Sequence, residues 1–225
     1  MAIRMYSGLP GSGKTTKLAQ IALEKLEQYP KLEKQGELRT LRSNIKFSDE
    51  IENKYLKYIE YFEDIYDMPN WHDSDIFIDE AAVYFDSRSW EMMPKGIRRF
   101  LFTHRHLGCE LYMIAQDFTT IDNSFRRLTA NLYYVHKILS TREPSYHGKP
   151  IKRPFNLARI GTVKKAYWHM EKEHYQYEQQ QLTLFTRKHF AIFDTRQSLP
   201  EQDLPPLIKQ VRVCPEDGYT RTKYI

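Results

Sequence analysis

The sequence predicts an α/β fold in which helices flank a mainly parallel sheet, and three features lead to this prediction. Residues 8–15, GLPGSGKT, match the G-x-x-x-x-G-K-[ST] phosphate-binding motif. An alternating apolar stretch precedes the motif, and apolar residues at helical spacing follow it. Residues 75–80 and 110–116 are short apolar runs that end in polar side chains, as buried parallel strands do. These features indicate a series of strand, loop and helix units.

A strand, a helix and a second strand are expected within residues 3–45. Apolar and polar residues alternate over residues 3–6, which suits a short strand. Apolar side chains then recur at helical spacing as far as Pro30, at Leu18, Ile21, Ala22 and Leu26. Residues 38–45 alternate again, after a polar connection that contains Gly36. This arrangement completes a βαβ unit with the phosphate-binding motif at its first turn.

The motif has the chemistry of a nucleotide site. Glycines let the backbone fold around an anion, while amide N–H groups and the helix N-terminus supply partial positive charge. Lys14 is expected to reach the β- and γ-phosphates, and Thr15 to offer its hydroxyl to Mg²⁺. A glycine-rich turn that fits by chance is the alternative, and the flanking strand and helix argue against it. The expected nucleotide contacts are Gly8, Leu9, Pro10, Gly11, Ser12, Gly13, Lys14, Thr15 and Thr16.

Two adjacent carboxylates end the apolar run of residues 75–80. We expect Asp79 to hold the Mg²⁺ shell with Thr15, and Glu80 to polarise the attacking water as general base. Small-molecule kinases keep water from the phosphoryl group, so an acid placed directly after the Mg²⁺-binding aspartate favours hydrolysis over transfer. The alternative is a strand that ends in two solvated carboxylates without a function. The presence of a phosphate-binding motif in the same chain argues against this alternative.

Gln116 ends the apolar run of residues 110–116. In an open α/β sheet the ligand crevice lies at the carboxyl ends of the strands. Gln116 is therefore placed to sense the γ-phosphate or to orient water, and a capping glutamine at a loop start is an equal alternative. A short helix over residues 122–128 is expected to expose Arg126 and Arg127, as candidate arginine fingers or DNA contacts.

A group of histidines and a cysteine resembles a metal cluster at first sight. His104, His106 and Cys109 have the spacing of no standard zinc site and lack a fourth ligand, so metal binding there is disfavoured. Basic and aromatic residues are interleaved at Lys164, Lys165, Tyr167 and Trp168, a combination that can stack bases and neutralise phosphates. An ordinary exposed hairpin shows the same alternation.

The remaining elements divide the chain into a P-loop ATPase core, residues 1–140, and a second part, residues 141–225. The second part is expected as a basic connection, a hairpin and a C-terminal extension packed on the core, which together form a small β-rich extension. In the core we expect a helix over residues 48–66 with an acidic face, a helix over residues 96–103 and a strand over residues 131–139. In the second part we expect a hairpin formed by residues 156–160 and 163–168 about Gly161 and Thr162, and a helix within residues 171–181. An edge strand over residues 189–193 and an irregular tail from Ser198 are expected to follow.

Composition limits the compartment and the partners. The 225 residues carry a formal charge of +5, which suits a polyanionic partner without requiring one. Cys109 and Cys214 follow no disulfide or zinc pattern, so a reducing cytosol is expected. No signal peptide and no long apolar run is visible, so no segment is expected to span a membrane.

In their order and spacing these motifs resemble the zonular occludens toxin-like (Zot-like) ATPases, a family that includes assembly proteins of filamentous phages. The resemblance implies a RecA-like P-loop core in which the strand of Gln116 lies between the phosphate-loop strand and the Asp79 strand. The matching segments are residues 7–15, residues 43–45 (SNI), residues 78–81 (IDEA), residues 104–108 (HRHLG), Gln116, residues 121–122 followed by Arg126, and residues 194–195.

The resemblance also implies a function: a motor, acting as a homo-oligomeric ring, that couples ATP hydrolysis to extrusion or packaging of single-stranded DNA in virion assembly. ATP and Mg²⁺ are the implied cofactors, and the catalytic residues are Glu80, Lys14, Gln116 and Arg126. Filamentous-phage members carry a transmembrane helix and a further domain, which we do not find here. Two alternatives follow: either a separate membrane protein completes the machine, which then acts peripherally at the inner membrane, or this version works in the host cytoplasm, for example with a capsid protein that it loads with DNA.

Two other functions are compatible with a phosphate-binding loop. In the first, the chain is an interaction protein of the assembly machinery, in which ATP orders a binding surface without significant turnover. In the second it is a P-loop kinase, which is the weakest hypothesis because no acceptor-binding segment is recognisable. ATP is preferred over GTP on the family resemblance alone, since no base-reading motif is visible.

Overall fold

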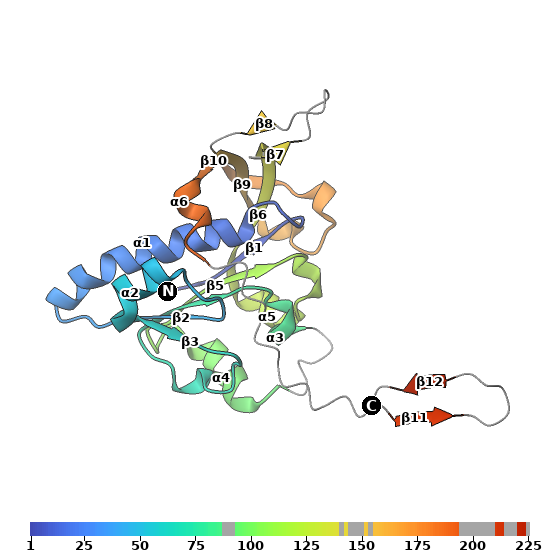
Figure 1. Ribbon diagram of the computed structural model, residues 1–225, viewed down its shortest axis with the longest axis horizontal. Coiled ribbons are helices and arrows are strands. Elements are labelled where there is room, and N and C mark those ends of the chain that lie inside the picture. Colours follow the sequence, from blue (N-terminus) through green and yellow to red (C-terminus); the bar gives the residue numbers. More distant parts are fainter. Residues whose placement is uncertain are drawn as a thin grey trace. The chain divides into compact units, whose positions relative to one another are not determined.

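A single sheet of eight strands organises the larger part of the chain (Figure 1). The computed structural model describes residues 1–86, 93–139, 142–143, 151–152, 155–193, 210–213 and 220–223. Contacts divide the chain into two units, Met1–Asp194 and Thr195–Ile225. In sheet order the strands are β10 (Tyr177–Thr186), β9 (Phe155–Val163), β6 (Thr129–Leu139), β1 (Ile3–Ser7), β5 (Glu110–Ala115), β4 (Ser74–Ile78), β2 (Thr40–Ser43) and β3 (Ile59–Tyr61).

The sheet is parallel from β6 to β3, and β9 and β10 extend it in antiparallel orientation. The predicted α/β class with a mainly parallel sheet is confirmed. β5 lies between β1 and β4, as the family resemblance implies. The carboxyl ends of these three strands therefore meet at one edge of the sheet, which brings the phosphate-binding motif, Asp79 and Gln116 to the same place.

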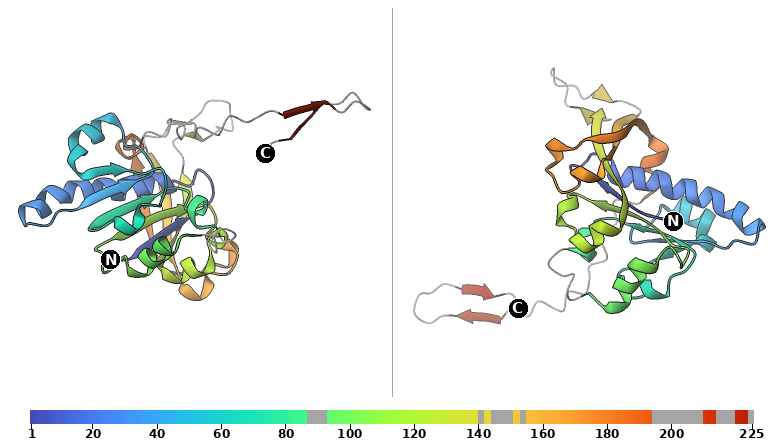
Figure 2. Two further views of the ribbon diagram at one scale, coloured as in Figure 1. Left: turned by 90° about the horizontal axis from the view of Figure 1, so that it is seen from below. Right: turned by 180° about the vertical axis from the view of Figure 1, so that it is seen from behind.

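Helices cover the sheet because alternate side chains of its central strands enter two hydrophobic cores. On β4, Ile76 and Ile78 belong to one core and Phe77 to the other. The long helix α1 (Lys14–Lys34) packs on the Phe77 side, where it lies along the sheet in Figure 2. It continues past Pro30 because Leu32 still packs against that core. The other α-helices of the described ranges are α2 (Asp49–Tyr55), α3 (Ala82–Phe85), α4 (Lys95–Thr103), α5 (Asn123–Leu128) and α6 (Arg187–Phe190).

The predicted helix over residues 48–66 is wrong in its second half. Helix α2 ends at Tyr55, a 3₁₀ turn η1 (Leu56–Tyr58) follows, and β3 then pairs in parallel with β2, with Ile59 opposite Leu41. Ile59 is buried in the core on the α1 side. The local periodicity suits a helix, but the open edge of β2 offers backbone hydrogen bonds and burial, and this tertiary contact overrides the local preference.

The predicted hairpin about Gly161 is also wrong. Strand β9 runs through Gly161 without turning and pairs with β10, with Gly161 opposite Gln180. A Cβ at Gly161 would lie 2.3 Å from Cδ1 of Tyr177, so glycine serves close packing between strands here, not a turn. The predicted helix within residues 171–181 is replaced by the 3₁₀ turn η6 (Lys172–His174) and the start of β10.

Two predictions near the end of the chain need correction. In place of the expected strand over residues 189–193, residues 189–190 end the helix α6, a turn follows, and Phe193 forms an isolated bridge with Phe47. The tail is not wholly irregular, because β11 (Gln210–Val213) and β12 (Thr220–Lys223) pair in antiparallel orientation within the second unit. The C-terminal part of the chain therefore contains β structure, as expected, but this hairpin lies where an irregular tail was predicted. Most of the expected basic connection lies outside the described residues, apart from β7 (Arg142–Glu143) and β8 (Ile151–Lys152).

No helix in the described part of the chain is both long enough and apolar enough to cross a membrane.

Candidate functional site

The phosphate-binding motif forms the turn between β1 and α1, which begins at Lys14. Gly13 has φ 99°, a left-handed conformation that favours glycine. A Cβ at this position would also lie 2.9 Å from Cε2 of Phe185 on β10. The turn is closed by a hydrogen bond from the Ser12 N–H to the Leu9 carbonyl at 3.1 Å. This backbone, followed directly by a helix N-terminus, has the form that binds phosphate groups.

Lys14 is held against the motif itself. Its Nζ donates to the carbonyl oxygens of Gly8 at 2.9 Å and Leu9 at 3.0 Å. The side chain is buried, and burial lowers the pKa of Lys14, an effect that the carboxylates at the end of β4 oppose. The ammonium group thus lies beside the expected phosphate position, with carbonyl partners that a phosphate can replace.

Thr15 and Asp79 are in direct contact. Thr15 Oγ1 donates to Asp79 Oδ2 at 3.2 Å, so the structure brings together the two residues predicted to share Mg²⁺. A hydroxyl and a carboxylate are the oxygen ligands that Mg²⁺ prefers, so this pair fits that ion. Burial, and next the charge of Glu80, raise the pKa of Asp79. Such desolvation favours a cationic partner for this carboxylate.

Asn44 fixes the backbone of Asp79, a role that sequence reasoning missed. The Asp79 N–H donates to Asn44 Oδ1 at 2.8 Å, and Asn44 Nδ2 donates to the Asp79 carbonyl at 3.0 Å. Asn44 directly follows β2, the neighbour of β4 in the sheet. Its place in the SNI segment of the family resemblance was the available signal, but the sequence alone did not connect it to Asp79.

Glu80 and Gln116 meet at the ends of β4 and β5. Gln116 Nε2 donates to Glu80 Oε1 at 3.1 Å. Glu80 has φ 51°, which is unusual for a residue with a side chain and costs conformational energy. The Ala81 N–H then donates to the Ile114 carbonyl at 2.7 Å, which fastens the chain after β4 to β5. The expected acid pair and the expected sensor therefore form one cluster with the motif.

The arrangement of these motifs is that of a known family. A model of the zonular occludens toxin (Zot) family matches residues 2–183. The chain belongs to the Zot family. The N-terminal domain of zonular occludens toxin from Neisseria meningitidis is a similar solved structure, with TM-score 0.53 and 18% sequence identity, covering 86% of this chain and 98% of that chain. The family predicted from the sequence is confirmed.

Two other similar structures have lower TM-scores. FlaH, a flagellar accessory protein from Methanocaldococcus jannaschii, has TM-score 0.48 and 13% identity, covering 80% of this chain and 84% of that chain. The genome-packaging NTPase B204 from Sulfolobus turreted icosahedral virus 2, in complex with ATP-gammaS, has TM-score 0.41 and 15% identity, covering 82% and 97%. No curated protein matches the sequence.

In this Zot-family chain, Arg126 packs against Phe118. Its guanidinium lies 6.0 Å from the ring centroid of Phe118, and its Nε is buried. The prediction of an exposed side chain is wrong for Arg126, which is partly buried, and correct for Arg127. In the described ranges, no hydrogen bond joins Arg126 to the acid pair or to Gln116.

Trp168 and two residues of the apparent metal cluster, His104 and Cys109, are buried, whereas His106 is exposed. Trp168 is buried and its indole N–H donates to the Val163 carbonyl at 2.8 Å, so the predicted base-stacking role for Trp168 is wrong. His104 Nδ1 lies 2.8 Å from the Leu101 carbonyl oxygen, and Cys109 Sγ donates to the Trp71 carbonyl at 3.5 Å. Both side chains are buried and have backbone partners.

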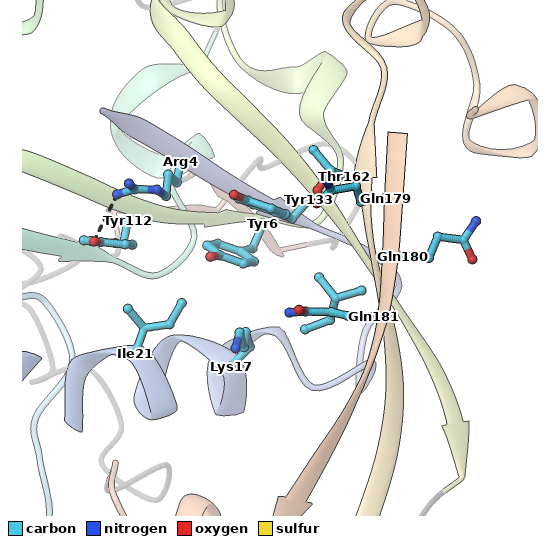
Figure 3. Close-up of a pocket in the computed structure, with 11 residues that line it drawn as sticks. Arg4, Tyr6, Lys17, Ile21, Tyr112, Tyr133, Thr162, Gln179, Gln180 and Gln181 are labelled. Atoms are coloured by element: carbon cyan, nitrogen blue, oxygen red, sulfur yellow. Dashed lines mark hydrogen bonds between the residues drawn. The ribbon is translucent and has the colours of Figure 1, made fainter. Parts of the chain in front are cut away.

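A polar cleft of about 350 Å³ lies between α1 and the sheet (Figure 3). Arg4, Lys17 and the stacked rings of Tyr6 and Tyr133, whose centroids are 4.8 Å apart, are among its lining residues. Gln179, Gln180 and Gln181 of β10 also line the cleft, and Gln181 points toward Lys17 (Figure 3). None of the motif residues 8–15 lines this cleft, nor do Asp79, Glu80 or Gln116.

Lys172 is the second residue that sequence reasoning missed. It belongs to η6, between β9 and β10, and its Nζ donates to the Gln116 carbonyl at 3.2 Å. The two residues are 56 positions apart, and no motif in the sequence connects them. Only the path of the chain between β9 and β10 brings this lysine to the edge of the sheet.

Proposed function

We propose that this chain is an ATP-hydrolysing motor for phage morphogenesis, which couples turnover to packaging or extrusion of single-stranded DNA. The observation that carries the proposal is the contact between Glu80 and Gln116 beside the phosphate-binding motif. Glu80 directly follows Asp79, the proposed metal ligand, and accepts a hydrogen bond from Gln116 of the neighbouring strand's end. A carboxylate in this place is suited to activating water. Membership of the Zot family supports the same assignment.

The proposed chemistry assigns each group a task. Backbone N–H groups of residues 8–13, apart from Pro10, which has none, and the Lys14 ammonium bind the phosphates, with Lys14 exchanging its carbonyl partners for phosphate oxygens. Thr15 and Asp79 would hold Mg²⁺, which when bound neutralises charge on the β- and γ-phosphates. Glu80 accepts a proton from water as the water oxygen bonds to the γ-phosphorus and the bond to the leaving oxygen breaks. Gln116 orients that water.

The DNA partner is proposed to enter the cleft beside α1. Arg4 and Lys17 carry positive charge, and tyrosine rings and glutamine amides offer stacking and hydrogen bonds. The net charge of +5 agrees with a polyanionic ligand. We further propose a homo-oligomeric ring in the host cytoplasm, in which Arg126 supplies positive charge to a neighbour's nucleotide. A membrane or capsid protein would complete the machine.

A second function is favoured by the same hydrogen bond. Because Gln116 already occupies an oxygen of Glu80, the chain can be an interaction protein in which ATP rearranges this contact without appreciable turnover. The two functions differ in a single measurable quantity, the rate of phosphate release.

Steady-state ATPase activity of the wild type and Glu80→Gln, measured across protein concentration with and without single-stranded DNA, tests the proposal. Turnover that rises with concentration and DNA, and disappears in the variant while ATP binding persists, supports the motor. ATP binding without turnover under every condition supports the interaction protein. Full turnover in Glu80→Gln would contradict the assignment of the general base.

A further inference from the structure

The segment between β9 and β10 contacts the carboxyl end of β5, which lies three strands away from β9 in the sheet. Residues 164–176 leave the end of β9, form η5 (Lys165–Tyr167) and η6, and return to β10. At η6 the Lys172 Nζ donates to the Gln116 carbonyl at 3.2 Å and lies 3.4 Å from Asp117 Oδ2. This lysine therefore sits at the carboxyl end of β5, next to the residue that contacts Glu80.

The segment is anchored, so Lys172 is held in place. The Lys164 N–H donates to the Gln176 carbonyl at 2.8 Å, which closes the base of the segment. Trp168 is buried and packs edge-on against Phe118, with ring centroids 5.6 Å apart. Tyr175 is likewise buried and packs against Tyr134. Two aromatic side chains thus tie both halves of the segment to the core that supports β5.

The positive charge of Lys172 acts on Lys14 of the phosphate-binding motif. Burial is the main cause of the lowered pKa of Lys14, and the positive charge of Lys172 adds to it. Two ammonium groups that repel each other across a site are both stabilised when an anion enters between them. An ammonium has three donors, and the contacts of Lys172 with Gln116 and Asp117 leave one for a further acceptor.

We propose that Lys172 contacts the γ-phosphate of the bound nucleotide, as a cation supplied within the same subunit by the segment between β9 and β10. The inference rests on the proposed function, because it assumes that the motif binds a nucleoside triphosphate. It adds a specificity-determining residue: Lys172 distinguishes the triphosphate from the diphosphate. Because Lys172 Nζ also donates to the Gln116 carbonyl, it would link recognition of the γ-phosphate to Gln116, whose side chain contacts Glu80.

Equilibrium binding of ATPγS and ADP to the full chain, wild type against Lys172→Met, tests the inference. We expect Lys172→Met to weaken ATPγS binding roughly 10-fold to 100-fold, the effect of losing one charge-assisted hydrogen bond, and to change ADP binding by less than about 3-fold. Lys172→Arg should restore most of the ATPγS affinity. Lys164→Met, at an exposed lysine of the same segment, should leave both affinities unchanged.

The outcomes separate this inference from the function on which it rests. A wild type that binds neither nucleotide contradicts the proposed function. A wild type that binds both, with equal weakening of ATPγS and ADP or no weakening in Lys172→Met, overturns the role of Lys172 alone. Thermal unfolding of each variant identifies general loss of structure. If Lys172→Met loses structure, the ratio of ATPγS affinity to ADP affinity in Lys172→Arg decides. A ratio like that of the wild type supports the contact of residue 172 with the γ-phosphate, and a ratio near one overturns it.

Discussion

The side chain of Asn44 forms two hydrogen bonds with the backbone of Asp79, accepting from its N–H at 2.8 Å and donating to its carbonyl at 3.0 Å. Because Asn44 and Asp79 follow neighbouring parallel strands, this pair fixes where the carboxylate leaves the sheet. The position of Asp79, the proposed Mg²⁺ ligand, thus depends on Asn44, which takes no part in the proposed reaction.

Asn44→Ala should therefore lower kcat more than it weakens nucleotide binding, because the phosphate-binding motif stays intact while Asp79 loses its support. Two partly buried backbone groups lose their partners, so we expect a loss of about 1–3 kcal/mol in the free energy of unfolding. ATPase kinetics and urea unfolding measure the two effects. Asn123→Ala, at an exposed asparagine of α5, is the control; equal behaviour of the two variants would contradict the role of Asn44.

Gln116→Ala removes the donor to Glu80 but keeps the backbone carbonyl that anchors Lys172. If Gln116 orients the attacking water, kcat should fall by about 10² while ATPγS affinity stays within a few-fold. If the hydrogen bond instead restrains Glu80, turnover without DNA should rise. Single-turnover phosphate release decides between them, and the second result would favour the nucleotide-switched interaction protein.

Gly13→Ala should abolish nucleotide binding. The left-handed φ of 99° disfavours a side chain, and the new Cβ would approach the Phe185 ring at 2.9 Å. Gly36→Ala is a matched control, because Gly36 has φ 86° and a Cβ added there would meet no atom within 4 Å. It should cost about 1 kcal/mol of stability and no nucleotide affinity. Normal ATPγS binding by Gly13→Ala, measured by calorimetry, would show that this turn does not hold the phosphates.

Gln181→Glu should weaken binding of single-stranded DNA, because it places a carboxylate in the cleft that Arg4 and Lys17 line. Gln35→Glu adds the same charge at an exposed glutamine that follows α1 and does not line the cleft. We expect a several-fold loss of DNA affinity at low salt in the first variant only, measured by fluorescence anisotropy. Equal losses in both variants would indicate a general charge effect and remove the cleft from the proposed DNA path.

Acid should destabilise the protein partly through Glu110. Burial alone would raise the pKa of this carboxyl, but hydrogen bonds from Tyr112 and Lys25, with the charges of Lys25 and Arg4, lower it to about 2 from its usual 4.5. A lowered folded-state pKa contributes stability above pH 4.5 that is lost as the pH falls toward 2. Urea unfolding between pH 7 and pH 3 should therefore show a steeper loss for the wild type than for Glu110→Gln. The exposed Glu37→Gln should follow the wild type, and parallel curves for all three proteins would contradict this account.

Much of the site could be predicted because its chemistry is written in short, local patterns. The phosphate-binding motif needs glycines and a following helix, and both lie within residues 8–34. Asp79 and Gln116 each end an apolar run, and parallel strands bring their carboxyl ends to one edge. Neighbouring strands then make the contacts of Thr15 with Asp79 and of Glu80 with Gln116.

Local pattern could not identify the residues whose place depends on a distant strand. Residues 59–61 suit a helix by periodicity and become β3 because β2 has a free edge. Gly161 resembles a turn and serves close packing against Tyr177, since its partner strand lies further along the chain than a hairpin allows. The sequence connects neither Asn44 to Asp79 nor Lys172 to Gln116, because these hydrogen bonds exist only after the sheet has formed. The amino-acid pattern thus predicted the candidate phosphate-binding motif and the sheet edge at which it lies, whereas tertiary packing chose the residues that support it, because long-range contacts leave no mark on local periodicity.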